Sequence, residues 1–187
     1  MQTDERLAQY PLRQALLPGA EGLAIFAERG TVEWLSRPER FLIVCEGRGG
    51  SIYASNECAL AEAQALVQDL HGAQVVCRPP EIHRYQAEDG HVVEPLMFVR
   101  LKAPVAYLAR IGEDLARRGV TIEEQDVQHH DVVVRAQGWL QDLLGYPQAL
   151  QELTDGSATL WTWLLRYQFR SPPPAAPGPS SAPRSRD

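Results

Sequence analysis

Residues 93–101 read VEPLMFVRL, and the predicted layout of the second half of the chain starts from this stretch. Met97, Val99 and Leu101 stand at every second position, which is the spacing of a β-strand that buries one face. Pro95 lies near the start of the strand, where an edge position tolerates a residue without a backbone N–H. The stretch therefore predicts a strand with one apolar face packed against a second layer.

A helix and a hairpin are predicted after this strand. Pro104 stands where a helix can begin, and apolar residues then recur three or four positions apart until Gly119 ends the pattern. The recurring residues are Tyr107, Leu108, Ile111 and Leu115. Residues 120–127 and 131–136 alternate like two strands. The short connection between them, from Gln128 to His130, predicts a hairpin.

A second helix and a last strand complete this half. Apolar residues from Trp139 to Leu153 predict a helix interrupted at residues 145–147, and a strand follows over residues 158–167. The resulting order, βαββαβ, is that of a ferredoxin-like fold in which both helices cover one sheet face. Trp161 and Trp163 share one face of the last strand, and this favours core packing over an exposed aromatic platform for a base or a partner.

The first half of the chain predicts short strands and one long helix. Strands are expected at residues 23–27, 31–35, 41–46, 51–54 and 74–77, with a continuation at 81–85, and turns at Gly30 and at residues 47–50. Residues 57–71 form the helix, which Asn56 caps and Gly72 ends. The fold class is therefore α+β, with two small ferredoxin-like two-layer sandwiches.

Three segments are expected from the polar and proline-rich stretches of the chain. The polar stretch at 86–91 separates an irregular, partly ferredoxin-like domain at residues 1–86 from a second domain at residues 92–170. Residues 171–187 read SPPPAAPGPSSAPRSRD, which offers almost nothing to bury and predicts a disordered tail.

Composition excludes several classes of protein. The formal net charge of -6 over 187 residues argues against broad adhesion to nucleic acid, and we expect no DNA partner. The sequence offers no run of apolar residues that would cross a bilayer and no basic-then-apolar leader, so we expect a cytoplasmic protein without a membrane partner. The three cysteines lack CxxC spacing, which indicates neither a disulfide framework nor a zinc site.

The sequence also predicts no catalytic centre and no cofactor. A GTPase needs a glycine-rich loop that ends in Lys-Ser or Lys-Thr, whereas Gly47–Ser51 has no lysine and leads into a strand. Residues 129–131, His-His-Asp, look like a solvated hairpin turn, because neighbouring strand side chains point to opposite faces and do not meet one metal ion. The acidic pairs at 113–114 and 123–124 read as solvated faces. We therefore expect a protein that is not an enzyme and holds no metal.

Three stretches in order resemble the C-terminal domain of elongation factor G and of the tetracycline ribosomal protection proteins. The stretches are Val93–Met97; Ala103-Pro104 with Tyr107-Leu108 and residues 117–119; and Leu144–Tyr146 with Leu150, Leu153-Thr154 and Gly156. The resemblance covers about residues 92–167. It departs from the family at residues 156–158, Gly-Ser-Ala in place of Gly-Arg-Gly, and at Trp139, where proline is common. Residues 51–85 carry a weaker likeness to the family's preceding ferredoxin-like domain.

The resemblance implies a role on the ribosome without nucleotide hydrolysis. In the family this domain lies near the sarcin-ricin loop and the stalk base of the large subunit, so rRNA and stalk-base proteins are the implied partners. Arg110, Arg117 and Arg118 are the candidate RNA-binding residues, although the same arginines could simply complement a helix dipole. The implied function is a non-catalytic accessory or regulatory factor in translation. Two alternatives stay open: a ferredoxin-like module that binds a protein or small ligand, or a fragment completed by a separate GTPase chain.

Overall fold

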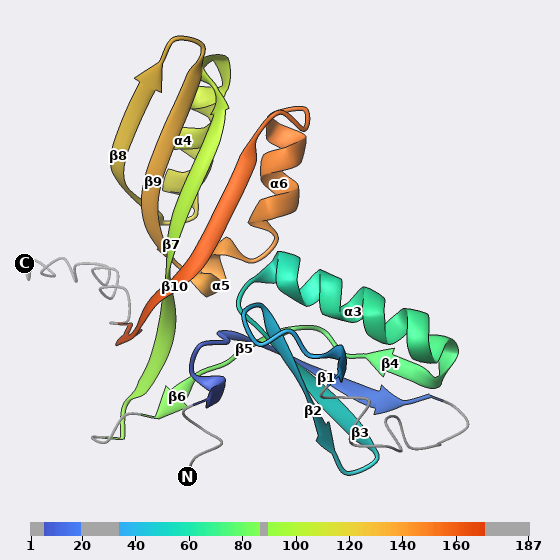
Figure 1. Cartoon of the computed structure of the whole chain (residues 1–187). Coiled ribbons are helices and arrows are strands. Elements are labelled where there is room, and N and C mark those ends of the chain that lie inside the picture. The colour runs from blue at the N-terminus through green and yellow to red at the C-terminus, as the bar shows by residue number, and fades with distance from the viewer. Residues whose placement is uncertain (1–5, 20–33, 87–89, 171–187) are drawn as a thin grey trace, which may run out of the picture.

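The computed structural model describes residues 6–19, 34–86 and 90–170, and these form two antiparallel sheets with helices packed on them (Figure 1). The strand order is β2-β3-β1-β4 in the first sheet and β10-β7-β9-β8 in the second. The expected fold class, α+β with two small ferredoxin-like units, is confirmed. The strand predicted at 23–27, the turn at Gly30 and the tail at 171–187 lie outside the described residues.

The first sheet is built around a strand that the sequence pattern did not predict. This strand, β1 (Leu12–Pro18), pairs with β3 (Gly49–Ala54) on one side and with β4 (Val75–Cys77) and β5 (Glu81–Ile82) on the other. The edge strand β2 (Phe41–Glu46) pairs with β3. The predicted strand at 41–46 is therefore confirmed, whereas the strand predicted at 31–35 is wrong where the structure describes it, because Trp34 and Leu35 are helical.

The turn between β2 and β3 is shorter than predicted. Only Gly47 and Arg48 form it, and Gly47 has a φ of 60°, which glycine adopts without strain. Gly49 and Gly50 belong to β3. A Cβ on Gly49 would lie 2.3 Å from the carbonyl oxygen of Leu16 in β1, so glycine is needed there for close strand packing.

One long helix covers the first sheet. This helix, α3 (Glu57–His71), has the predicted bounds, and Asn56 caps it by accepting a hydrogen bond from the Ala59 amide at 2.9 Å. Its buried side chains, Ala59, Leu60, Ala63 and Val67, face the sheet. Gly72 ends the helix with a φ of 52°, and a short 3-10 turn, η1 (Gly72–Gln74), leads into β4.

The second sheet has the predicted βαββαβ order. Its inner strand β7 (Val92–Pro104) is longer than predicted and pairs with β10 (Thr159–Phe169) and β9 (Asp131–Trp139), while β8 (Thr121–Gln128) lies at the far edge. Met97, Val99 and Leu101 are fully buried, as expected. Pro95 lies on an inner strand and not at an edge; it is tolerated because β9 pairing begins only at Leu96.

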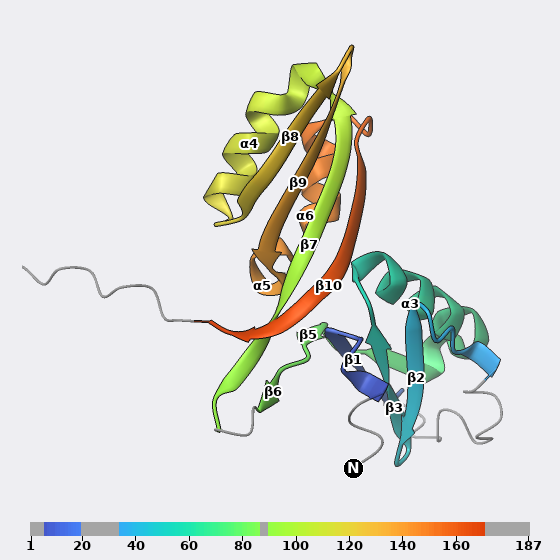
Figure 2. The same ribbon diagram turned by 60° about the vertical axis from the view of Figure 1, so that its left-hand side comes forward.

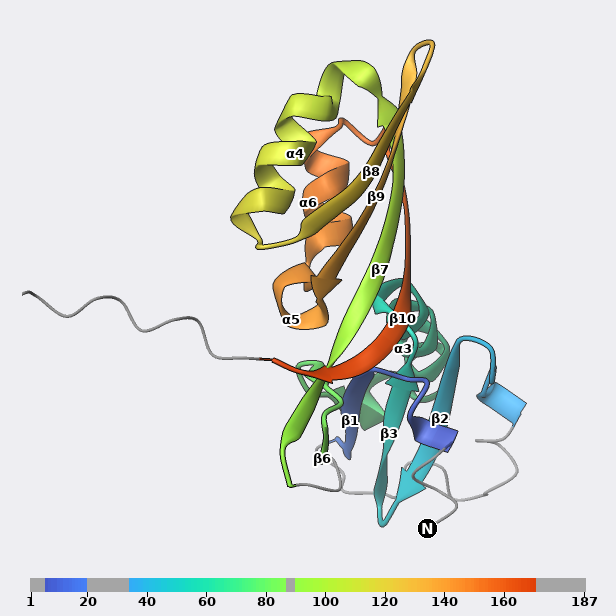
Figure 3. The ribbon, with the colours of Figure 1, turned by 90° about the vertical axis from the view of Figure 1, so that its left-hand side faces the viewer.

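The described helices of the second unit all lie on one face of its sheet (Figure 3). After a 3-10 turn, η2 (Val105–Tyr107), comes α4 (Leu108–Arg117), which buries Ile111 and Leu115. The predicted second helix is present as two pieces, α5 (Leu140–Leu143) and α6 (Tyr146–Leu153). Gly145 separates them with a φ of 74°. The other face of the sheet, called the open face below, carries none of these helices.

The two units meet along β10 and through the linker. β10 is the strand of the second sheet that faces the first unit (Figures 1 and 2). The Asn56 side-chain amide donates to the Thr162 carbonyl at 3.3 Å, and Glu57 accepts from the Gly145 amide at 2.9 Å. The linker strand β6 (Tyr85–Gln86), assigned to the first domain by the sequence, pairs with β7 of the second sheet. None of the described helices is long and apolar enough to cross a membrane.

Candidate functional site

Two of the three predicted RNA-binding arginines are presented to solvent by α4. Arg110 and Arg117 are exposed and lie seven residues apart, so they stand about 10 Å apart along one helix face. The opposite face of α4 buries Ile111 and Leu115, and this packing keeps the face with the two arginines toward solvent. Arg117 pairs with Asp114 at 3.2 Å but keeps 75% of its side chain exposed. Arg110 forms no ion pair with any residue that the structure describes.

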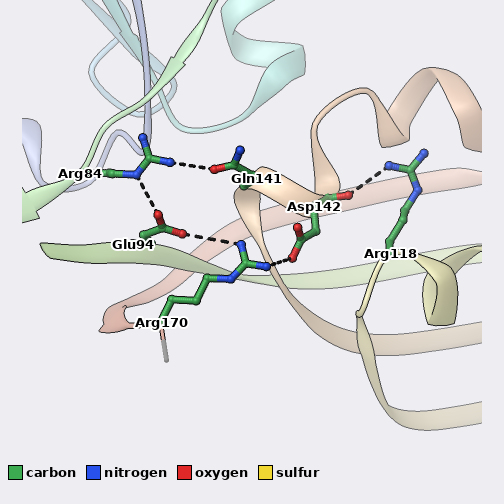
Figure 4. Close-up of polar contacts among 6 residues, drawn as sticks. All are labelled: Arg84, Glu94, Arg118, Gln141, Asp142 and Arg170. Carbon is green, nitrogen blue, oxygen red and sulfur yellow. Dashed lines mark hydrogen bonds and ion pairs between the residues drawn. The ribbon is translucent and has the colours of Figure 1, made fainter. Parts of the chain in front are cut away.

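Arg118, the third, is turned inward. Its guanidinium pairs with Asp114 at 3.0 Å, donates to the Asp142 carbonyl at 3.1 Å and lies 5.1 Å from the centre of the Tyr146 ring. Only 23% of the side chain is exposed. The contact with Asp142 is shown in Figure 4. Arg118 therefore joins α4 to α5 and α6, and a phosphate would have to displace these contacts to reach it.

A second polar cluster ties the linker to the second unit (Figure 4). Arg84 of the linker pairs with Glu94 at 2.8 Å and donates to Gln141 at 2.7 Å. Arg170 pairs with Asp142 at 2.8 Å and with Glu94 at 3.7 Å. The cluster fixes the ends of β7 and β10 beside α5, which is a structural role. Its members lie far apart in the sequence, so no local pattern could have revealed it.

Trp161 and Trp163 lie on the open face of the second sheet, so the core-packing interpretation is wrong. Their β7 partners in register are Arg100 and Phe98, whereas the neighbouring Thr162 pairs with the buried Val99. Strand alternation therefore turns Thr162 toward the helices and both tryptophans away from them. Trp161 is 42% exposed and Trp163 is 45% exposed.

The open face holds an ordered aromatic arrangement. Phe98 and Trp163 stack with ring centres 4.7 Å apart and planes 27° from parallel, and the Arg100 guanidinium lies 5.1 Å from the centre of the Trp161 ring. The sequence already indicates that Phe98 and Arg100 share one face of β7, because they alternate with Met97 and Val99, which are buried.

A cleft of about 400 Å³ lies between this edge of the second sheet and the first unit. Trp161 and Trp163 line one side. The first unit contributes Glu39, Arg40, Ser55, Asn56, Glu57 and Cys58, from the turn before β2 and the start of α3. Burial raises the pKa of the Glu57 carboxyl, while the Gly145 amide that donates to it acts in the opposite direction.

The acidic and histidine pairs considered from the sequence do not converge on a reactive centre. Glu124 pairs with Arg135, and Glu123 accepts from Gln137, across β8 and β9. His129 and His130 form the β8–β9 turn, where His129 has a φ of 55°. Within the described ranges, no three His, Cys, Asp or Glu side chains gather as a metal site.

Comparison with known proteins finds relatives of the second unit. Residues 91–174 match the family described as elongation factor G C-terminus. Ribosome-releasing factor 2, mitochondrial, from Rattus norvegicus and from Mus musculus is 37% identical over 84 residues, which is 45% of this chain; the Bos taurus protein is 34% identical over the same length. The match spans only 11% of the length of these relatives.

A solved structure supports the fold of both units together. A crystal structure of a Thermus thermophilus protein superposes with a TM-score of 0.57 and covers 85% of this chain and 40% of its own. The sequence identity is 14%, so this likeness concerns the fold alone. The family match covers residues 91–174, so the unit built from β7 to β10 is similar to the elongation factor G C-terminus.

Proposed function

We propose that this protein is a non-catalytic, ribosome-associated accessory or regulatory factor in translation and that it works in the cytoplasm. The observation that carries the proposal is the match of residues 91–174 to the elongation factor G C-terminus, together with 37% identity to a protein named as a ribosome-releasing factor. The large ribosomal subunit, through rRNA and stalk-base proteins, is the partner that this family implies.

The surface proposed for docking is the α4 basic face, made of Arg110 and Arg117. Both guanidinium groups project from one side of a helix whose other side is anchored in the core. A guanidinium can form two parallel hydrogen bonds to one phosphate, which suits the backbone of folded RNA. Arg118 is not part of this face, because it contacts Asp114, Asp142 and Tyr146. Its role is to hold α4 against α5 and α6.

Co-sedimentation of the purified protein with ribosomes tests this surface. The variant Arg110→Glu/Arg117→Glu should stop pelleting with ribosomes, because two phosphate attractions become repulsions. A charge-matched control is Arg6→Glu/Arg78→Glu, which changes two exposed arginines of the first unit by the same total charge and should pellet like the wild type.

The salt dependence gives a second readout. Two phosphate contacts predict that the logarithm of the association constant falls with a slope of about -1.8 against the logarithm of salt concentration, on the coefficient for duplex nucleic acid. If the charge-reversed variant pellets as well as the control at every salt concentration, the α4 basic face is not the docking surface.

A second candidate is a protein completed by a separate GTPase chain. The observation behind it is that residues 91–174 are similar to one domain of elongation factor G. Genes encoded next to this one would show it: a neighbouring reading frame that carries a GTPase domain without an elongation factor G C-terminus supports completion in trans, and its absence argues for independent action.

A further inference from the structure

The exposed strip along β10 and β7 combines aromatic rings with positive charge. We define the β10 strip as Trp161, Trp163 and Arg166 of β10 with Phe98 and Arg100 of β7. The register places them in successive rows on one face: Arg100 beside Trp161, Phe98 beside Trp163, and Arg166 beside Leu96 after a β-bulge. The two arginines stand at opposite ends of the aromatic centre, about 13 Å apart along the strands.

Both arginines of the strip keep their charge uncompensated. Arg100 and Arg166 are exposed, and neither forms an ion pair within the part of the chain that the structure describes. Other cations on the same face are neutralised: Lys102 pairs with Asp131 at 2.8 Å, and Arg135 pairs with Glu124. The strip is therefore the place on this face where positive charge is available to a ligand.

The cleft beside the strip offers hydrogen-bonding groups opposite the aromatic rings. Trp161 and Trp163 line the cleft together with Arg40, Ser55 and Asn56, and the carboxylates of Glu39 and Glu57 also line it, so the phosphates must lie toward Arg100 and Arg166 and not in the cleft. A planar ring that stacks on an indole there would present its polar edge to the first unit. A nucleobase has this combination of an apolar face and a polar edge, and its phosphates match the two flanking guanidinium groups.

We propose that the β10 strip binds single-stranded RNA, with bases stacked on Trp161 and Trp163 and backbone phosphates on Arg100 and Arg166. A proline-rich peptide also docks on aromatic rings, but it brings no negative charge for these two arginines. The site is distinct from the α4 basic face, because α4 lies on the opposite side of the sheet (Figure 3). Stacking accepts every base, so little sequence preference is expected.

Fluorescence anisotropy with a labelled oligouridine of about eight nucleotides tests the proposal on the full chain. Trp161→Ala and Trp163→Ala should each weaken binding by about 5-fold to 150-fold, the range for loss of one stacked base. Trp161→Phe and Trp163→Phe keep an aromatic face and should retain most of the affinity. The control is Trp34→Ala, which removes an 83% exposed tryptophan of the first unit and should change nothing.

Salt dependence tests the phosphate contacts. Two contacts to a single strand predict a slope of about -1.4 in the log–log plot, and Arg100→Gln/Arg166→Gln should bring the slope close to zero. Two results would overturn the proposal: no binding by the wild type, or alanine variants that bind like the control. Because the assay contains no ribosome, its outcome does not depend on whether the protein co-sediments with ribosomes.

Discussion

Replacing Arg118 by alanine should destabilise the protein by about 2 kcal/mol. The change removes a charged hydrogen bond to the Asp142 carbonyl, worth about 1.5–3 kcal/mol, and a cation–π contact with Tyr146, worth about 0.5–2 kcal/mol. Two effects reduce the loss. Alanine has no side-chain entropy to lose on folding, and Asp114 keeps Arg117 as a partner at 3.2 Å. The remaining pair with Arg117 matters because the Asp114 side chain is only 13% exposed, and a carboxylate that is largely buried needs a partner.

Chemical denaturation followed by circular dichroism measures this effect, and Arg117→Ala is the matched control one residue away. Because the Arg117 side chain is 75% exposed, its loss should cost less than about 0.5 kcal/mol. The melting temperature of Arg118→Ala should fall by about 4–8 °C for a protein of this length. Equal stabilities for the two variants would refute the inward assignment and return Arg118 to the candidate RNA-binding residues.

Three further outcomes are expected. Gly138→Ala should destabilise the protein by about 1–3 kcal/mol in the same denaturation assay, because the new Cβ would lie 2.8 Å from Val120 Cγ2; an unchanged midpoint would show that this contact relaxes freely. Truncation after Arg170 should change stability by less than about 0.5 kcal/mol, since the removed residues have the composition of a segment that buries nothing, and a fall of several degrees would contradict this. Calorimetry should detect no micromolar binding of GTP, because the sequence has no Walker-type loop to hold the phosphates; a measurable micromolar affinity would reject that reasoning.

Local patterns predicted the elements whose determinants are close in sequence. The helix at 57–71 was predicted to the residue because its cap, its apolar stripe and its terminal glycine all lie within the segment. The break at Gly145 was likewise visible from the Gly-Tyr-Pro sequence. The strand β1 was missed because its pairing partners in β3 and β4 are at least 30 residues away in the sequence.

The sites required three-dimensional information that spacing does not contain. Arg117 and Arg118 are neighbours in the sequence, yet one is exposed and the other is held by Asp142 and Tyr146 from a later segment. Trp161 and Trp163 were correctly placed on one face of a strand. Which face this is depended on their register with Arg100 and Phe98 in β7, and strand alternation alone cannot decide that.

Sucrose-gradient sedimentation of the tagged protein in its own cell lysate tests whether this protein associates with ribosomes. At low salt the protein should migrate with fractions that contain the large subunit, and it should move to the top of the gradient as salt rises or when Arg110 and Arg117 are replaced by glutamate. A wild-type protein that stays at the top of the gradient at low salt would show that it does not associate with ribosomes.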